Sequence, residues 1–276
     1  FSELLNKYDK LSAQEKFLLR DKLKDLRRNF PENTNLLLAL AILNQSNGKN
    51  EAAIALLERI LSINPNHRQS ILLKSSIQLG EGLPHALSEI RQALKRNPKD
   101  SKLRLEYAKL LTRKDLAESR KQFEILSAES PKNPELLLSL ALINQEAGDT
   151  VVAKAYLHKL IVNQQKVNEA RTFLARIAER EKNLQEALIH YSLVDDSPEF
   201  LFANSRIGQI LLRTNHLSDF AKHFNGTRRR YIHLGEELFS LEAELLSKDG
   251  FFEESLSVFS RGITLYPNSL NLRYNR

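Results

Sequence analysis

Histidines are the residues of this 276-residue chain best suited to acid–base or metal chemistry. There are seven: His67, His85, His158, His190, His216, His223 and His233. None belongs to an HExxH pair, which would set two imidazoles on one helix face around a zinc ion, and no two are four residues apart. His233 and Glu236 have a ligand-like spacing, but a solvated helix end explains this pair more simply. We therefore predict no metal site.

Nucleophilic and phosphate-handling motifs are also missing from the sequence. There is no cysteine, which excludes thiol catalysis, thiolate metal sites and redox switching within these residues. There is no GxSxG elbow and no glycine-rich phosphate loop. Asp195 and Asp196 lie in a predicted turn, where aspartate is expected for its local hydrogen bonds. We expect no catalytic residue and no cofactor, and hence a protein that is not an enzyme.

The net charge of +7 and the isoelectric point of about 9.5 raise the question of an anionic partner. The densest basic run is Thr227 to Arg230, which could hold phosphate or an acidic peptide. Cations on the last turn of a helix also offset its dipole, and we favour that explanation. Nucleic-acid binding would need aromatics interleaved with a basic stripe, whereas these aromatics mostly fall at predicted core positions. No apolar run approaches the roughly 18 residues of a membrane span.

Proline spacing exposes an internal repeat, because Pro31, Pro65, Pro98 and Pro131 are separated by 34, 33 and 33 residues. The segment that ends at Pro65 is NLLLALAILNQSNGKNEAAIALLERILSINP. It predicts a first helix, a turn at Gly48 and a second helix. The residues that line these two helices are Leu37, Leu40, Ala41, Ala53, Leu57 and Ile60.

The same frame recurs further along the chain, with small residues at the eighth and twentieth places of the unit. These let paired helices approach, while larger residues fill the gap to the next pair. The matching sets are Leu137, Leu140, Ala141, Gly148, Ala153, Leu157 and Leu160, then Leu174, Ala175, Ala187 and Tyr191, then Phe239, Ala243, Gly250, Ser255, Phe259 and Pro267. One unit diverges, with Ile207, Gly208, Asn215, Phe220 and Phe224. Because Phe220 stands where a small residue is expected, we predict looser or shifted packing there.

This pattern resembles the tetratricopeptide repeat (TPR). The resemblance implies an all-α, TPR-type α-solenoid: a right-handed superhelix of about seven antiparallel helix pairs, with partial repeats at both ends. Ser12 and Glu15 form a predicted capping box at the helix that ends before Pro31. We expect one continuous array over 1–276, divided into leading helices at 1–31, repeats at 32–65, 66–98, 99–131, 132–165, 166–198, 199–233 and 234–267, and the start of a further repeat at 268–276.

In the TPR family, ligands lie along the inner, concave groove against the exposed side of each first helix. Carried over by repeat frame, the implied partner-binding residues are Asn35, Leu38, Ile42, Gln45, Leu72, Lys102, Leu105, Lys109, Arg113, Glu135, Leu138, Leu142, Gln145, Thr172, Arg176, Arg180, Ser205, Gln209 and Arg213. The frame also places Phe202 and Glu179 in this groove. Groove leucines could bind a partner helix or peptide, or they could complete the packing between neighbouring first helices. The Lys-and-Asn clamp for a terminal carboxylate is absent, since Leu38 and Ile42 occupy its places.

Nearly the whole chain resembles TPR outer-membrane lipoproteins of Gram-negative bacteria. The stretches that carry this are FPENTNLLLALAILNQSNGKNEAAIALLE, DSKLRLEYAKLL, LLSLALINQEAGDTVVAKAYLHKLI, LEAELLSKDGFFEESL and YPNSLNLRYNR. The resemblance implies a periplasmic scaffold and adaptor, anchored to the outer membrane as a lipoprotein. It also implies partners, namely a carboxyl-terminal processing protease and substrates such as cell-wall hydrolases. The lipidated cysteine of such a protein is not among these residues.

Two other functions stay open at this point. The array could be the recognition arm of a larger enzyme, or it could bind an anionic polymer, for which affinity should fall steeply with salt. If the groove binds proteins, Leu38→Glu combined with Leu138→Glu should abolish partner capture and leave the helical content intact.

Overall fold

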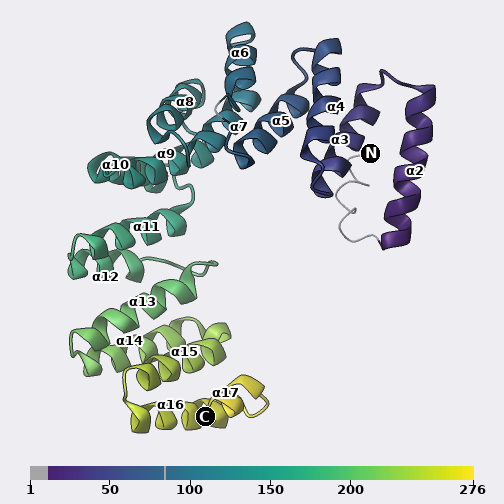
Figure 1. The fold of residues 1–276 in the computed structure, drawn as a ribbon. Coiled ribbons are helices and arrows are strands. Elements are labelled where there is room, and N and C mark those ends of the chain that lie inside the picture. The colour runs from purple at the N-terminus through teal and green to yellow at the C-terminus, as the bar shows by residue number, and fades with distance from the viewer. Residues whose placement is uncertain (1–11, 84) are drawn as a thin grey trace. The chain divides into compact units, whose positions relative to one another are not determined.

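Helices follow one another throughout residues 12–83 and 85–276, the part of the chain that the computed structural model describes, and these ranges contain no strand (Figure 1). The helices are α2 (Ala13–Asn29), α3 (Thr34–Ser46), α4 (Asn50–Ile63), α5 (Arg68–Gly80), α6 (Ser88–Arg96), α7 (Ser101–Leu111), α8 (Leu116–Glu129), α9 (Pro134–Glu146), α10 (Thr150–Val162), α11 (Val167–Arg180), α12 (Leu184–Ser192), α13 (Phe200–Arg213), α14 (Leu217–Arg230), α15 (Gly235–Lys248), α16 (Phe252–Leu265) and α17 (Leu270–Asn275). A short 3₁₀ turn, Ile232–Leu234, precedes α15. The predicted all-α class is confirmed.

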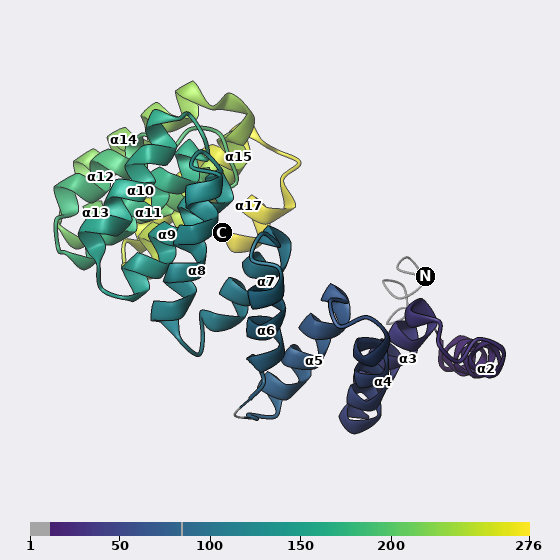
Figure 2. The same ribbon diagram turned by 90° about the horizontal axis from the view of Figure 1, so that it is seen from above.

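In the described ranges, consecutive helices pair into seven hairpins, from α3 with α4 to α15 with α16, and each predicted repeat range contains one of them. The chain divides into two compact units, Phe1–Ser130 and Pro131–Arg276. The first, unit 1, contains α2 to α8, and the second, unit 2, contains α9 to α17. Within each unit successive hairpins stack side by side, as two perpendicular views show (Figures 1 and 2). One continuous array over the whole chain stays a prediction, and residues 1–11 of the predicted leading helices lie outside the described ranges.

Local sequence signals place the helix ends. The capping box at α2 is confirmed: the Ser12 backbone N–H donates to the Glu15 carboxylate at 2.8 Å, and the Glu15 N–H donates to Ser12 Oγ at 3.3 Å. Asn33 and Asn133 accept backbone N–H bonds at the starts of α3 and α9 in the same way. Gly48 adopts φ of 72° in the turn after α3, a left-handed conformation that glycine takes without steric strain. These caps begin α2, α3 and α9, and the Gly48 turn separates α3 from α4.

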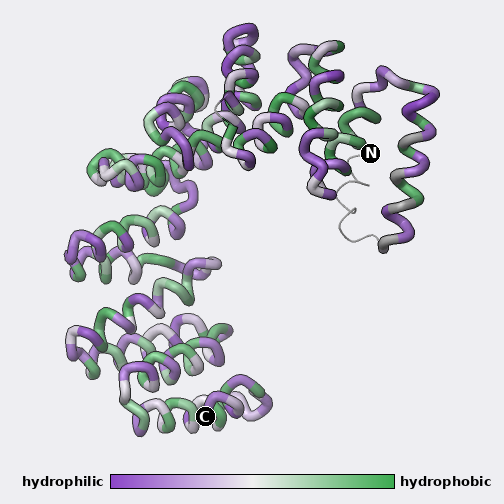
Figure 3. The backbone as a smooth tube through the Cα atoms, in the orientation of Figure 1, coloured by the Kyte–Doolittle hydropathy of each residue, from purple (hydrophilic) through white to green (hydrophobic). Residues whose placement is uncertain are grey.

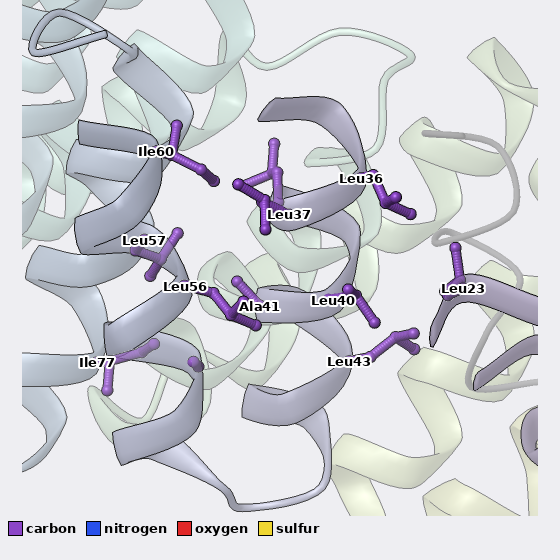
Figure 4. Close-up of a cluster of buried hydrophobic side chains, with 12 residues drawn as sticks. Leu23, Leu36, Leu37, Leu40, Ala41, Leu43, Leu56, Leu57, Ile60 and Ile77 are labelled. Carbon is purple, nitrogen blue, oxygen red and sulfur yellow. The ribbon is translucent and has the colours of Figure 1, made fainter. Parts of the chain in front are cut away.

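Small residues at the eighth and twentieth places lie buried where the two helices of a hairpin cross. In the first full repeat these are Ala41 and Ala53, both fully buried. They belong to a core cluster that also takes Leu23 from α2 and Ile77 from α5, so neighbouring hairpins complete it (Figure 4). In two units serine replaces alanine at the twentieth place, and its hydroxyl donates to a facing backbone carbonyl. Ser119 donates to Ala108 and Ser255 donates to Ala243, both at 2.8 Å.

The divergent hairpin, α13 with α14, is tightly packed, so of the two predicted alternatives, looser or shifted packing, the looser one is wrong. Phe220 is 1% exposed, and its ring lies against the backbone of Gly208 on the facing helix. A Cβ added at Gly208 would come within 3.0 Å of Phe220 Cε2 and 2.7 Å of Leu245 Cδ1. Where the two helices of this hairpin cross, the side chain at the eighth place is smaller than usual and the one at the twentieth is larger. Glycine at the eighth place makes room for phenylalanine at the twentieth.

Apolar and polar residues alternate along the helices, as expected for helices that bury one face and leave the other in water (Figure 3). Among the residues described, no helix combines the length and the hydropathy needed to cross a membrane.

Candidate partner-binding surface

The predicted groove residues lie on the first helix of each hairpin, and we call their exposed side the first-helix face. In unit 1 they belong to α3, α5 and α7, except Arg113, which lies in the turn after α7. In unit 2 they belong to α9, α11 and α13. Their side chains differ in accessibility, and this separates core residues from candidates for binding.

Three predicted groove residues are buried and cannot meet a partner in this structure. Leu38 is 8% exposed, Leu138 is 7% exposed and Thr172 is 7% exposed. Leu38 packs in a core cluster that includes Ile77 of the next hairpin, and Leu138 packs in one that includes Leu174. Their assignment as groove residues is therefore wrong, and for Leu38 and Leu138 the reason is that they complete the packing between neighbouring hairpins. The double substitution Leu38→Glu with Leu138→Glu would damage the core rather than test the groove.

The first-helix face of unit 1 is mixed in character. Ile42, Leu72 and Leu105 are half-buried, and the exposed polar positions are Asn35, Gln45, Lys102, Lys109 and Arg113. The Lys109 ammonium donates to the Glu106 carboxylate at 2.9 Å, which offsets part of the positive charge. This face offers no pronounced charge of one sign.

The α9 part of unit 2 presents an apolar residue beside polar ones. Leu142 is 38% exposed, and Gln145 is half-buried. The exposed Glu135 carboxylate lies 3.0 Å from the Lys166 ammonium, which also contacts Glu169 at 3.0 Å. These two carboxylates raise the pKa of Lys166. The Lys166 ammonium is therefore already paired with two carboxylates of its own chain.

A cavity of about 420 Å³ opens between the first helices α11 and α13, and we call it the arginine slot. Its lining consists of Arg176, Glu179 and Arg180 from α11 and of Phe202 and Arg206 from α13. Residues four apart share a helix face, so each wall carries a pair one turn apart, Arg176 with Arg180 and Phe202 with Arg206. The repeat frame predicted all of these except Arg206. Its spacing from Phe202 is the signal that would have found it.

Glu179 is fully engaged inside the slot. It accepts a bond from the Tyr191 hydroxyl at 2.6 Å and from Arg206 Nε at 3.1 Å, and a second Arg206 nitrogen contacts its other oxygen. Burial raises the pKa of Glu179, but these hydrogen bonds outweigh it and hold the pKa below its ordinary value. Arg206 also contacts Gln209 Oε1. Among the described residues, Glu179 is the carboxylate that lines the slot, and Arg206 neutralises it.

Three other arginines form no ion pair with a carboxylate of the described residues. Arg176, Arg180 and Arg213 are exposed, and among residues 12–83 and 85–276 no ion pair involves any of them. The charge of Arg213 contributes to the lowered pKa of Glu179, which places it near the slot. The Arg176 guanidinium lies 5.6 Å from the ring centroid of Phe173. The slot is therefore a cationic site whose donors are free to meet an anionic group.

Phe202 supplies an apolar wall beside these cations. It is 45% exposed, although its ring packs edge-on against Tyr191 with 6.2 Å between centroids. An aromatic side chain held in place by a neighbour and still half accessible loses little entropy when a ligand covers it. The site combines fixed positive charge with a rigid apolar surface.

The basic run at the end of α14 is not a second site of this kind. Arg228 pairs with the buried Glu242 and lies 4.1 Å from the Phe239 ring centroid, while Arg230 approaches Asp195 at 3.9 Å. The three arginines fall in the last turn of the helix, the position that the dipole explanation requires.

The His233–Glu236 spacing does not form a ligand pair either. His233 Nε2 contacts Asp196 Oδ2 at 2.8 Å, whereas Glu236 accepts from Ser269 Oγ at 2.6 Å. In the described part of the chain, no three histidine or acidic side chains are grouped to hold a metal.

Comparison with known proteins bears directly on the repeat. Family descriptions named "Tetratricopeptide repeat" match residues 34–67 and 138–200. A TPR repeat-containing protein of Pseudomonas aeruginosa, PA4667, is 31% identical over 256 residues, which cover 91% of this chain. The chain spans 43% of that relative's length.

Solved structures with similar folds include a tetratricopeptide repeat protein from Parabacteroides merdae. It has a TM-score of 0.52 and 16% identity, and the match covers 87% of this chain and 96% of that one. A TPR protein of Thermus thermophilus has 24% identity and a TM-score of 0.41 over 65% of this chain and 99% of that one. The helical hairpins, their buried small residues and the matched segments lead to one conclusion: the chain carries tetratricopeptide repeats and folds as a TPR-type α-solenoid.

Proposed function

We propose that this chain is a non-catalytic scaffold that binds proteins through its first-helix faces, with the arginine slot as the main polar contact of unit 2. The observation that carries the proposal is that Arg176 and Arg180, which form no ion pair, line the same cavity as the half-exposed Phe202. Arginine and aromatic residues dominate the energetics of protein interfaces when they are accessible and held in place. TPR-containing relatives support binding of protein partners in general.

A finer proposal concerns the partners. We propose that the chain acts as an adaptor in the periplasm, where it would assemble a carboxyl-terminal processing protease with substrates such as cell-wall hydrolases. Its support is the resemblance to TPR outer-membrane lipoproteins, together with the similarity to the Pseudomonas aeruginosa TPR protein. Anchoring to the outer membrane as a lipoprotein belongs to the same proposal.

Reconstitution with purified components tests this adaptor role. The chain would be mixed with the carboxyl-terminal processing protease and a cell-wall hydrolase of the same bacterium, and both complex formation and the cleavage rate would be measured. We expect the chain to form a complex with the protease and to accelerate cleavage of the hydrolase.

Two variants sharpen the assignment to the first-helix face. Leu142→Glu and Arg176→Glu alter exposed positions of that face, and each should weaken the complex without loss of helical content. Arg229→Ala, an exposed position on a second helix, is the matched control. If protease and chain do not associate at micromolar concentration and cleavage is unchanged, the adaptor role is wrong.

A further inference from the structure

We infer that the arginine slot recognises an extended acidic segment of a partner protein, in which two carboxylates two residues apart flank an apolar side chain. This inference rests on the proposed protein-binding function and specifies the chemistry of one of its contacts. The charge of the slot, the spacing of its arginines and its apolar wall each determine one feature of the ligand.

The charge of the slot selects carboxylates. Arg206 is already paired with Glu179, so the groups left for a ligand are the guanidinium groups of Arg176 and Arg180, with Arg213 nearby. A guanidinium presents paired N–H donors that match the two oxygens of a carboxylate, and such charge-assisted pairs are about twice as strong as neutral hydrogen bonds. An acidic side chain meets two guanidinium groups that form no ion pair here, whereas a basic one is repelled.

The spacing of the arginines selects two carboxylates in alternate positions. Arg176 and Arg180 are four residues apart on α11, which corresponds to a rise of ~6 Å along the helix. In an extended segment, residues i and i+2 point the same way and are ~6.6 Å apart. A Glu-X-Glu sequence lying along α11 therefore brings one carboxylate to each arginine.

An extended segment meets both arginines with the shorter sequence. Carboxylates spaced i and i+4 on a helix need more than one helical turn of the partner. An extended Glu-X-Glu presents both carboxylates within three residues.

The wall opposite α11 selects the middle residue. In an extended chain the side chain of residue i+1 points away from those of i and i+2, hence toward α13. Phe202 lies on that wall, 45% exposed and held by Tyr191. An aliphatic side chain there removes apolar surface from water.

Fluorescence anisotropy with short peptides tests the inference. The probe is a labelled Gly-Glu-Leu-Glu-Gly peptide with both termini blocked, so that no terminal carboxylate is present. We expect at least 10-fold weaker binding of Gly-Gln-Leu-Gln-Gly and a smaller loss for Gly-Glu-Ser-Glu-Gly. Binding of the acidic probe should weaken as salt rises, because its contacts are exposed ion pairs.

Variants of the full chain locate the binding site. Arg176→Ala combined with Arg180→Ala should lower the affinity for the acidic probe at least 10-fold. Phe202→Ala should lower that affinity several-fold. Arg229→Ala combined with Lys248→Ala removes the same charge from exposed positions outside the slot and should change affinity less than 2-fold. Circular dichroism would establish that each variant keeps its helices.

Several results would overturn the inference. They are equal binding of the Glu and Gln peptides, equal loss in the slot and control variants, or binding only when the peptide carboxyl terminus is free. Displacement of the probe by single-stranded DNA at equal concentration would point to a nucleic-acid site instead. If the protease is captured while the probe is not bound, the adaptor proposal stands and this inference fails. If the probe binds while the protease is not captured, the reverse holds.

Discussion

At the scale of single residues, a residue that departs from the repeat pattern is accommodated by a change in the residue packed against it. Gly208 and Phe220 both depart from the usual sizes, and each makes sense only beside the other, because the ring fills the space that a Cβ at position 208 would occupy. A larger residue at position 208 should therefore strain the packing, and a smaller residue at position 220 should leave a cavity.

Gly208→Ala should destabilise the protein by about 1–3 kcal/mol through overpacking, although alanine is a better helix former by about 1 kcal/mol. Gly226 in α14 is the matched control, since a Cβ there meets nothing within 4 Å. Gly226→Ala should leave stability unchanged or raise it by up to about 1 kcal/mol. Urea unfolding of both variants checks this, and equal stabilisation of both would contradict the packing account.

His223 is the residue from which we expect a measurable pH dependence of stability. Burial lowers its pKa from 6.5 to about 4, and its Nε2 lies 2.8 Å from Asn204 Oδ1, to which the neutral ring can donate. Between pH 6.5 and about 4, the His223 ring is protonated in the unfolded chain but stays neutral in the folded chain. Stability should therefore fall as pH drops from 6.5 to about 4, by about 3 kcal/mol from this residue.

His223→Gln removes this titration and can keep a donor toward Asn204. The difference in free energy of unfolding between wild type and variant should shrink or change sign across pH 6.5 to 4, as followed by urea unfolding. Parallel curves across this window would show that the ring titrates alike in both states.

At the scale of elements, a first helix divides its apolar residues between two tasks. On α9, Leu138 completes the core with α11, whereas Leu142, one turn further along, is 38% exposed. The repeat frame assigns both to the groove. The neighbouring hairpin decides which of them is covered.

Leu138→Glu should therefore lower the free energy of unfolding by several kcal/mol, because it places an unpaired charge in the core. Leu142→Glu should change it by less than about 0.5 kcal/mol. Thermal or urea unfolding of the two variants measures both free energies and distinguishes the core residue from the surface residue. Comparable losses would show that Leu142 is also part of the core.

At the scale of the whole molecule, the chain divides into two units that each contain complete cores. The described hydrophobic clusters lie within one unit or the other: two in unit 1 and three in unit 2. Contacts in repeat arrays are made between near neighbours, so each unit has most of what its stability requires.

Residues 131–276 alone should fold into a helical domain and bind the acidic probe within about 3-fold of the full chain, because every residue of the arginine slot lies in unit 2. Circular dichroism and the anisotropy assay check this. A fragment that is unfolded at 25 °C would show that unit 1 is needed for the stability of unit 2.

Much of the fold follows from the sequence, since its signals are local. Small residues such as Ala41 and Ala53 and the turn glycines act within one hairpin, so periodicity alone places them, and the Ser12 cap follows from a local capping-box motif. The same periodicity located most of the arginine slot, because Arg176, Arg180 and Phe202 occupy fixed places in the repeat.

Only the tertiary structure decided which of these side chains a partner can reach. The burial of Leu38 and Leu138 depends on residues of the neighbouring hairpin. The exchange of sizes between Gly208 and Phe220 depends on how the two helices of one hairpin cross. The pairing of Arg206 with Glu179 joins residues 27 positions apart, whereas Arg176 and Arg180 form no ion pair with a carboxylate of the described residues. Repeat spacing specifies the face on which a residue lies, whereas its burial and its charge partners are set by the adjacent hairpin.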